Sequence, residues 1–506
     1  MSTVERTTAL ALQEKRKLVR SLRRFDMVFF TVCAFVGLDT LGIVSANGAQ
    51  AFTWLIVLAL LFVAPYMLLM AEVGSAFPQE GGPYEWVKLA FGRVIASVTA
   101  VLYWITNPIW VGGSLAFIST DAWRANLFSI GHGTFGDYVF KLAFIWLSIS
   151  VAIVALRYGK WIPNVGALLR ILLLGFFSLT VVIYAFKHGV HGMSAGDLSP
   201  TRAIFFALVP VLLFNYVGFE LQNGAAEEME NPQRDVPAAI MQSGVIGVLL
   251  YAVPIFCILL VLPGKAITGI GGFIDAVSTT FAGVYGGASN FLLDVMTLCF
   301  VGALVTSGAV WMIGSDRVQA IASADGGWFP WFGVFNQRLG TPVRVNVMSG
   351  VVSSIFMIVA VAFFKSGADS TFVVVLTIAI STTLLSYLFV FPAVAKLRTA
   401  YGHVHRPYVV PWGRAGLWTS AALTTFWIAL GSWEAVFPGS LEPVFGVDYG
   451  SFKAAWGVSR GKFEALTLGT LAVIIALSLA GYWAAARVRR QEVEAPLESA
   501  AATVAM

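Results

Sequence analysis

An aspartate lies between two glycines in the first long apolar stretch of the chain, in the segment VGLDTLG from Val36 to Gly42. A carboxylate at the centre of a bilayer costs roughly 2.5 to 3.5 kcal/mol or more, so Asp39 indicates a functional site by default. Its carboxylate could bind a substrate amine, carry a coupling proton or pair with an arginine. Gly37 and Gly42 would let the helix unwind here, or would pack against a neighbouring helix.

A second apolar segment, from Phe205 to Ile240, is interrupted by NYVGFE, Asn215 to Glu220. In hydrocarbon every backbone group needs a partner, so a helix unwinds at membrane depth only where protein or a water-filled cavity surrounds it. Each break begins about a dozen residues into its span, which predicts similar depths if the two helices enter from opposite sides. Paired breaks of this kind indicate the substrate site of a transporter built as an inverted repeat.

The ends of the half-helices suggest what such a site would bind. Helix N-termini offer N–H groups to an anion, and C-termini offer carbonyls to an ammonium or a metal ion, so a zwitterion fits the pair. Asn107 and Trp110 interrupt the third span, where they could line a cavity or mark a kink. The candidate substrate-binding residues are Gly37, Leu38, Asp39, Thr40, Gly42, Asn107, Phe214, Asn215, Tyr216, Val217 and Gly218.

Coupling candidates lie on two further spans. Arg170, in NVGALLRILLLGFF, is a fixed cation that could pair with Asp39, or snorkel to the interface if it lies near a helix end. A Thr-Ser pair on another span could hold a hard cation, although such pairs usually bond back to their own helix. The coupling candidates are Asp39, Arg170, Glu220, Thr306 and Ser307; Ala303, Thr306 and Ser307 would form a metal site only under sodium coupling. No other metal and no cofactor is expected.

The composition sets the class of protein. The 506 residues are 58% hydrophobic and 12% charged, with a mean hydropathy of +0.80, whereas a soluble domain carries about twice that share of charge. Taking about 20 apolar residues as one crossing, the sequence predicts an all-α polytopic membrane protein with twelve transmembrane helices. Their expected ranges are 26–49, 52–74, 94–119, 138–156, 161–186, 203–226, 239–262, 287–314, 346–364, 371–394, 416–437 and 464–486.

The basic residues predict the orientation. An even number of spans places both termini on one side, and that side holds 22 of the 32 Lys and Arg residues, against 8 in the opposite loops. Both termini are therefore expected in the cytoplasm, with the protein in the plasma (inner) membrane.

The expected organisation is a cytoplasmic tail over 1–25, an inverted-repeat core over 26–394 (repeats 26–186 and 203–394), helices 11 and 12 over 416–486, and a second cytoplasmic tail over 487–506. No Walker phosphate loop and no HExxH motif occurs, which argues against ATP coupling and against a zinc-dependent enzyme. A transporter-like sensor would need an output domain, and no such domain is expected between the spans. Nothing suggests a nucleic-acid partner or an oligomeric state.

Three stretches resemble the amino acid-polyamine-organocation transporter superfamily. They are AEVGSAFPQEGGPYEWVKLAFG (71–92), FNYVGFELQNGAAEEMENPQRDVPAAI (214–240) and GSDRVQAIASADGGWFP (314–330). The second is the most specific, because it carries the Glu-x-x-Asn-Pro-x-x-Asp-x-Pro loop that follows span 6 in this superfamily. The resemblance covers most of residues 25–395.

This resemblance implies a five-plus-five inverted repeat with broken helices 1 and 6 and two additional helices. It implies alternating-access transport of amino acids or related amines, with the backbone of 37–42 holding the substrate carboxylate and carbonyls of 215–218 meeting the amine. One departure is Gly-Leu-Asp-Thr at the first break, where the superfamily usually has a sequence like Gly-Ser-Gly-Ile. In related sodium-coupled monoamine carriers an aspartate of span 1 binds the amine, so Asp39 favours amines or unusual amino acids.

The resemblance also bears on coupling. Sodium-coupled relatives have a Thr-Ser pair in span 8 like Thr306-Ser307, whereas proton-coupled relatives and exchangers place a span 5 lysine where the sodium would bind. Arg170 aligns with that lysine, and its charge argues against sodium by Coulomb repulsion. We therefore expect a secondary active transporter, a symporter or antiporter, with H⁺ coupling or exchange; a sodium-coupled amine or amino acid symporter is the alternative.

Overall fold

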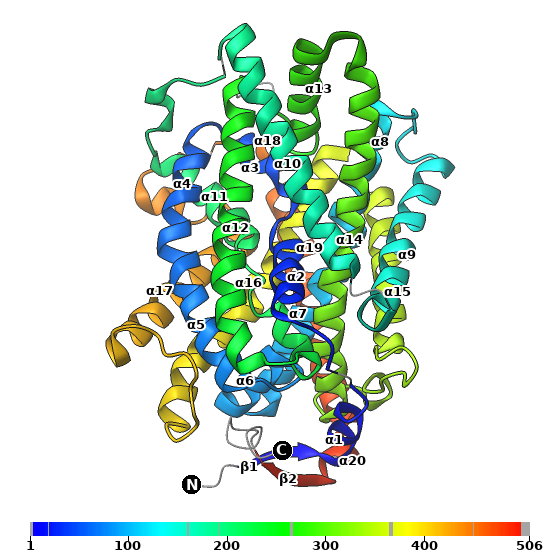
Figure 1. Ribbon diagram of the computed structural model, residues 1–506, viewed down its shortest axis with the longest axis vertical. Helices are drawn as coiled ribbons and strands as arrows, with labels where there is room; N and C mark the ends of the chain where they lie inside the picture. The colour runs from blue at the N-terminus through cyan, green and yellow to red at the C-terminus, as the bar shows by residue number, and fades with distance from the viewer. Residues whose placement is uncertain are drawn as a thin grey trace.

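A computed structural model describes residues 4–18, 20–158, 161–190, 192–263, 267–363, 368–448 and 450–496. Most of these residues are helical, and the helices stand side by side as an elongated bundle with both chain ends at one extremity (Figure 1). Within the described ranges, ten helices are long and apolar enough to cross a membrane. The chain is an all-α, multi-pass membrane protein.

The elements of the first half are β1 (Val4–Thr8), α1 (Ala9–Lys15), α2 (Arg24–Phe35), the 3-10 helix η1 (Leu38–Thr40), α3 (Leu41–Ser45), α4 (Gln50–Leu58), η2 (Ala59–Val63), α5 (Ala64–Ala76), α6 (Gly82–Phe91), α7 (Arg93–Trp110), η3 (Val111–Leu115), α8 (Ala116–Asn126), α9 (Phe135–Tyr158), α10 (Trp161–His188), η4 (Ala195–Leu198), α11 (Arg202–Asn215) and η5 (Leu221–Glu228).

Those of the second half are α12 (Pro232–Val261), α13 (Gly272–Tyr285), η7 (Gly286–Ala288), α14 (Ser289–Ala324), η8 (Pro330–Phe332), α15 (Val343–Phe363), α16 (Ala368–Ala400), α17 (Gly413–Val436), η9 (Glu442–Phe445), α18 (Phe452–Trp456), α19 (Arg460–Ala484), α20 (Ala486–Arg489) and β2 (Glu492–Pro496).

Two of the twelve expected spans are not among the ten long apolar helices. Span 6 is short, because its apolar helix ends at Asn215. Span 11 coincides with α17, which is less apolar than the others because threonine, serine and tryptophan recur along it. Ten crossings thus follow from length and apolarity, and the two remaining expected crossings correspond to a broken helix and a less apolar one.

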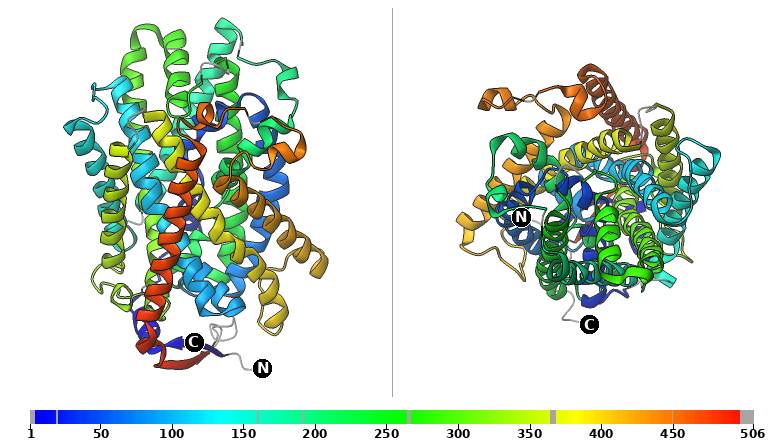
Figure 2. Two further views of the ribbon diagram at one scale, coloured as in Figure 1. Left: turned by 180° about the vertical axis from the view of Figure 1, so that it is seen from behind. Right: turned by 90° about the horizontal axis from the view of Figure 1, so that it is seen from above.

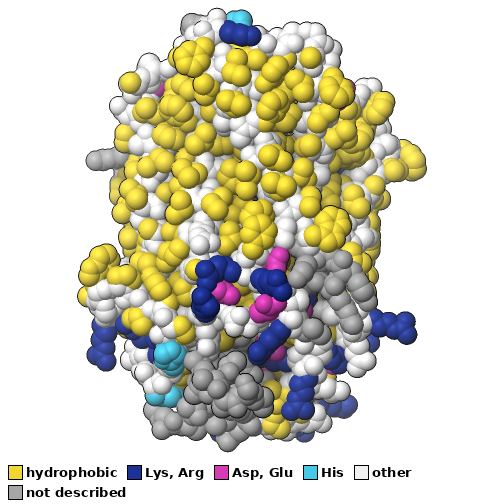
Figure 3. All heavy atoms as spheres, viewed as in Figure 1, with side chains coloured by type: hydrophobic (Ala, Val, Ile, Leu, Met, Phe, Trp, Pro, Cys, Tyr) yellow, Lys and Arg dark blue, Asp and Glu magenta, His cyan; other side chains and the backbone are white. Residues whose placement is uncertain are grey.

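The outer surface of the bundle suits a bilayer. Hydrophobic side chains cover the part of the molecule away from the chain ends, while Lys, Arg, Asp and Glu gather toward the ends (Figure 3). Exposed aliphatic residues on the peripheral helices include Leu147, Leu172, Leu179, Leu249, Ile355 and Val473. By contrast α2 is almost entirely buried and packs against α10, α12 and α14, and it lies inside the ring of helices seen from above (Figure 2).

The second half of expected span 6 differs from the prediction. Residues 221–228 form a 3-10 helix with a bend at Ala225 instead of continuing as an α-helix to 226. Here the backbone packs directly on α14, since a Cβ at Gly224 would lie 2.8 Å from the carbonyl oxygen of Gly314. The Asn223 amide also donates to the Gly74 carbonyl at 3.3 Å. Tertiary packing thus overrides the local helical pattern.

The chain ends were expected to be tails, but they pair with each other. Strands β1 and β2 form a two-stranded antiparallel sheet across the extremity of the bundle (Figure 1); residues 1–3 and 497–506 of the expected tails lie outside the described part. This sheet is fixed to the end of α14 through Asp325. Thr7 Oγ1 and the Thr8 N–H both donate to Asp325 Oδ1 at 3.0 Å, and Arg93 Nε donates to its Oδ2 at 3.0 Å.

The contacts of Asp325 with the β1–β2 sheet and with Arg93 should make the stability of the protein sensitive to acid. Burial alone would raise its pKa, but Lys88 and Arg93 lower the pKa of this carboxyl below its ordinary value. A lowered carboxyl pKa supplies stability that is present above about pH 4 and is lost as the pH falls through the pKa of the folded protein. Asp325→Asn should lower the free energy of unfolding by about 3 kcal/mol at neutral pH and remove this part of the acid sensitivity.

Thermal unfolding of the detergent-solubilised protein across the acid range would measure both effects. Glu492→Gln is a matched control, because Glu492 also contacts Arg93 but is about one-third exposed, so its loss should cost about 0.5 kcal/mol or less. Equal effects of the two variants would contradict the role assigned to Asp325.

Candidate functional site

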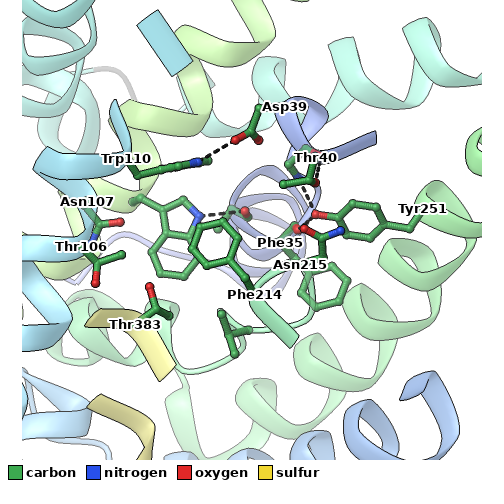
Figure 4. Close-up of a pocket in the computed structure, with 14 residues that line it drawn as sticks. Phe35, Asp39, Thr40, Thr106, Asn107, Trp110, Phe214, Asn215, Tyr251 and Thr383 are labelled. Carbon is green, nitrogen blue, oxygen red and sulfur yellow. Dashed lines mark hydrogen bonds between the residues drawn. The ribbon is translucent and has the colours of Figure 1, made fainter. Parts of the chain in front are cut away.

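Both predicted breaks are present, and side chains from neighbouring helices satisfy the backbone groups that the first one releases. Helix α2 ends at Phe35, and the chain re-enters helical conformation at Leu38. The Ala34 carbonyl accepts from Trp311 Nε1 at 2.9 Å. The Tyr251 hydroxyl bridges the break, because it donates to the Phe35 carbonyl and accepts from the Gly37 N–H, each at 2.8 Å (Figure 4). Such pairing is what allows a helix to open at membrane depth.

Arg170 completes this set from α10. Its Nε donates to the Val36 carbonyl at 3.0 Å, Nη2 donates to the Ala303 carbonyl at 2.7 Å and to the Ser307 hydroxyl, and Nη1 donates to Thr306 Oγ1 at 3.1 Å. The guanidinium is fully buried. Among the described residues it forms no ion pair with Asp39, since its donors are already directed at carbonyl and hydroxyl oxygens of α2 and α14. Of the alternatives that the sequence left open for Arg170, neither the pair with Asp39 nor snorkelling to the interface is present in the described part of the chain, and the cation is held between helices instead.

The second break follows Asn215 on α11. Gly218 has φ +126°, a conformation that favours glycine, and its N–H donates to the Tyr66 hydroxyl at 3.0 Å. The hydroxyl of Tyr216 donates to the Leu55 carbonyl at 2.9 Å, and its ring stacks on Phe35. The two broken segments therefore touch, as paired half-helices at one depth would.

A small cavity lies where the breaks meet; we call it the central cavity. It has a volume of about 20 Å³, room for roughly one water molecule. Its walls are Ala34, Phe35, Gly37, Asp39, Thr40, Thr106, Asn107, Trp110, Phe214, Asn215, Val217, Tyr251, Trp311 and Thr383, most of which are labelled in Figure 4. An amino acid or amine needs more space than this cavity offers.

Asp39 lines this cavity, and only one of its two carboxylate oxygens has hydrogen-bond partners among the described residues. Its Oδ2 accepts from Trp110 Nε1 at 2.7 Å and from the Ser114 hydroxyl at 2.9 Å, which fixes the carboxylate. Its Oδ1 is buried and has no hydrogen-bond partner within the described ranges. A buried carboxylate oxygen without a donor is costly, and an ammonium in the cavity would supply that donor.

Asn215 faces the cavity in the same condition. It is 2% exposed, and neither its Oδ1 nor its Nδ2 finds a partner among the residues described. An amide can donate to a carboxylate and accept from an amine. Asp39 and Asn215 thus present a cation acceptor and a two-way polar group to the same small space.

One helical turn from the cavity, toward the chain ends, Glu220 accepts three hydrogen bonds from tyrosines of three helices. Tyr103 donates at 2.7 Å, Tyr387 at 2.6 Å and Tyr66 at shorter range. All four side chains are buried. The cluster joins α5, α7 and α16 to the broken segment after α11. A substitution of Glu220 would therefore remove hydrogen bonds to all three helices.

Seven of the eleven candidate substrate residues line the central cavity and four do not. Leu38 and Gly42 are buried elsewhere, and a Cβ at Gly42 would lie 2.5 Å from the Gly269 carbonyl oxygen, so this glycine allows close packing. Tyr216 and Gly218 bond to their neighbours instead. The coupling candidates lie in three places: Asp39 in the wall of the central cavity, Arg170 with Thr306 and Ser307, and Glu220 with its tyrosines. Among the described residues no group of three or more His, Cys, Asp and Glu is placed to hold a metal ion.

Six lining residues escaped the sequence analysis: the apolar Ala34 and Phe35, and four with polar side-chain groups, namely Thr106, Tyr251, Trp311 and Thr383. Trp311 and Thr106 could have been identified from the sequence. Trp311 comes four residues after Ser307 and Thr106 directly precedes Asn107, so each shares a helix face or neighbour with a residue already chosen. Tyr251 lies in an otherwise apolar segment, and Thr383 ends the run Ser381-Thr382-Thr383, which the sequence analysis did not single out.

Comparison with known proteins agrees with this geometry. A family model for amino acid permeases matches residues 22–444, most of the chain. The chain belongs to the amino acid permease family. A protein of Lactococcus lactis described as a probable agmatine/putrescine antiporter is 26% identical over 388 residues, which cover 76% of this chain and 81% of that protein. A branched-chain amino acid permease of Bacillus subtilis is 23% identical over 400 residues, 70% of this chain and 82% of the relative.

Solved structures show the same fold at lower identity. A variant of the manganese transporter of Eremococcus coleocola superposes with a TM-score of 0.56 at 12% identity, covering 95% of each chain. At this identity the likeness concerns the fold alone. Its family and its relatives identify the permease as a transporter rather than an enzyme.

Proposed function

We propose that this permease is a secondary active transporter that moves an amino acid or related amine across the plasma (inner) membrane by alternating access. The observation that carries the proposal is the central cavity, where Asp39 Oδ1 and the Asn215 amide lack hydrogen-bond partners within the described residues and face one space. The family and the relatives' names support the same class of cargo. Twelve crossings in a five-plus-five inverted repeat, with both termini cytoplasmic, belong to this proposal.

The cargo is a primary amine rather than an ordinary α-amino acid. Trp110 and Ser114 fix the carboxylate of Asp39, a residue of the cavity wall, and a fixed carboxylate attracts an ammonium and repels a substrate carboxylate. The relative described as an agmatine/putrescine antiporter fits that preference. Aromatic rings of Trp110, Phe214 and Trp311 would enclose the methylene chain and offer cation–π contacts.

Transport is independent of sodium. The carbonyls of Val36 and Ala303 and the hydroxyls of Thr306 and Ser307 form an oxygen set that would suit a hard cation, and all of them accept from the Arg170 guanidinium. A permanent charge at this position repels Na⁺. Coupling therefore runs through a proton, with Glu220 or Asp39 as the carrier, or through exchange of one amine for another.

Uptake into proteoliposomes tests the proposal. Radiolabelled putrescine, agmatine, arginine and leucine would be offered under imposed proton or sodium gradients, and with vesicles preloaded with unlabelled amine. We expect uptake of an amine that is raised by a proton gradient or by preloading and is unchanged by sodium. Stimulation by sodium alone would favour the symporter alternative, and no uptake of any of these compounds by folded protein would overturn the assignment.

A further inference from the structure

A second cavity, of about 430 Å³, lies farther from the chain ends than the central one; we call it the outer cavity. The two share three helical segments. Asn47 follows Thr40 at the end of α3, Phe206 precedes Phe214 on α11, and Thr377 precedes Thr383 on α16. Each of these pairs is separated by about two turns, so the outer cavity stands directly above the central cavity on the same walls.

The lining of the outer cavity is apolar on one side and acidic on the other. The apolar side includes Ile43, Phe206, Val211, Val373, Ile380 and Trp456. The acidic side is formed by Glu434 near the end of α17, Glu442 at the start of η9 and Asp448 in the following loop. A volume of this size suits a small-molecule ligand.

The two glutamates are incompletely satisfied. Each is only 2% exposed, yet Glu434 Oε1 and Glu442 Oε2 accept no hydrogen bond from any residue in the described ranges. Buried carboxylates are normally paired or hydrogen-bonded, because an isolated buried charge is costly. Glu434 and Glu442 both line the outer cavity, and each carboxyl also accepts backbone N–H groups from Gly439 and Leu441, so a ligand would add donors to carboxyls that the protein satisfies only in part.

Arg460 is a fixed cation that acts on both glutamates and is also directed at other groups, among them Glu464 at 3.8 Å. Arg460 is close enough to influence Glu434 and Glu442 electrostatically, but its Nη2 donates to the Gly439 carbonyl at 3.4 Å and its guanidinium lies 4.8 Å from the centre of the Phe452 ring. Burial raises the pKa of Glu442 while Arg460 acts against that shift. Arg460 therefore keeps the region from carrying only negative charge, without bonding the two orphan oxygens.

We propose that the outer cavity is a peripheral binding site for an organic cation, a primary amine or guanidine on a short methylene chain, which it holds before delivery to the central cavity. The glutamate oxygens accept from the cationic group in charge-assisted hydrogen bonds. The methylenes pack on Phe206, Val373 and Ile380, surfaces that a hydrated metal ion would leave unused. The identity of the ligand as cargo depends on the proposed function, whereas the existence of the site does not.

Binding of putrescine to the purified full-length protein in nanodiscs, measured by calorimetry, tests the proposal. The Asp39→Asn variant serves as background, because it removes the central carboxylate and leaves the outer cavity intact. We expect this variant to retain one putrescine site, and Glu434→Gln together with Glu442→Gln to weaken that site at least about tenfold. Asp197→Asn removes an exposed carboxylate on the same side of the bundle and should leave the site unchanged.

The outcomes separate this inference from the proposed function. If Asp39→Asn binds no putrescine, or if the double glutamine variant binds it equally well, the outer site is overturned even when amine uptake by the wild type is normal. If the outer site responds as expected but the wild type takes up no amine, the site stands and the proposed function falls. If Mg²⁺ displaces putrescine at a lower concentration than agmatine does, the assignment of the ligand as an organic cation is overturned. Glu442→Gln alone, at the start of the short helix η9, provides the test should the double variant not fold.

Discussion

Replacing Asp39 by asparagine should reduce amine affinity and the transport rate at low substrate by about a hundredfold. Removing one partner of a buried, hydrogen-bonded charge pair costs about 2 to 5 kcal/mol, and the substrate ammonium would be that partner. The asparagine oxygen can still accept from Trp110 and Ser114, so the variant should fold. Uptake kinetics of a labelled amine in proteoliposomes, together with thermal unfolding, would measure both quantities.

Trp110→Phe is the matched control, because it disturbs the placement of the Asp39 carboxylate and leaves its charge unchanged. It removes one of the two donors to Asp39 Oδ2 and keeps the carboxylate, so we expect a loss of about tenfold or less. Unchanged kinetics of Asp39→Asn across a range of pH would make Asp39 a structural residue. A larger loss from Trp110→Phe than from Asp39→Asn would mean that aromatic contacts, not the charge, select the cargo.

The sequence predicted the two breaks and the importance of Asp39 because polar residues interrupt apolar spans at these positions. Asparagine and aspartate are unusual in hydrocarbon, so Asp39 and Asn215, each near glycine in an apolar span, indicated a site. Tyr251 has no such mark. A tyrosine in an apolar span is also typical of the membrane interface, and only the rotation of α12 shows that its hydroxyl bridges the first break.

The same limit explains the other features found only in three dimensions. Tyr66, Tyr103 and Tyr387 come from three helices and converge on Glu220 through packing angles that no local pattern encodes. The sheet between β1 and β2 joins segments at opposite ends of the chain, and such long-range pairing leaves no signal in a five-residue strand. Composition and periodicity predict which segments are helices, while tertiary packing decides which of their faces meet.

Neutralising Arg170 should lower the free energy of unfolding more than Asp39→Asn does. It should also alter the response of the protein to sodium. Arg170→Met removes the donors to Val36, Ala303 and Ser307 together. An unsatisfied buried acceptor costs about 1 to 3 kcal/mol, so we expect a loss of about 3 kcal/mol or more in the free energy of unfolding. Arg170→Lys keeps the charge with fewer donors and should lose less.

The oxygens that Arg170→Met would release form a cage for a small hard cation, and this gives the variant a distinctive signature. Sodium should stabilise Arg170→Met against thermal unfolding and leave the wild type and Arg170→Lys unaffected, because their fixed charge excludes it. Sodium at a hundred times its dissociation constant would add about 2.7 kcal/mol. Measuring unfolding in matched sodium and choline salts needs no knowledge of the cargo. A wild type stabilised by sodium would contradict sodium independence, and a variant indifferent to sodium would mean that the guanidinium holds the helices together without standing in for an ion.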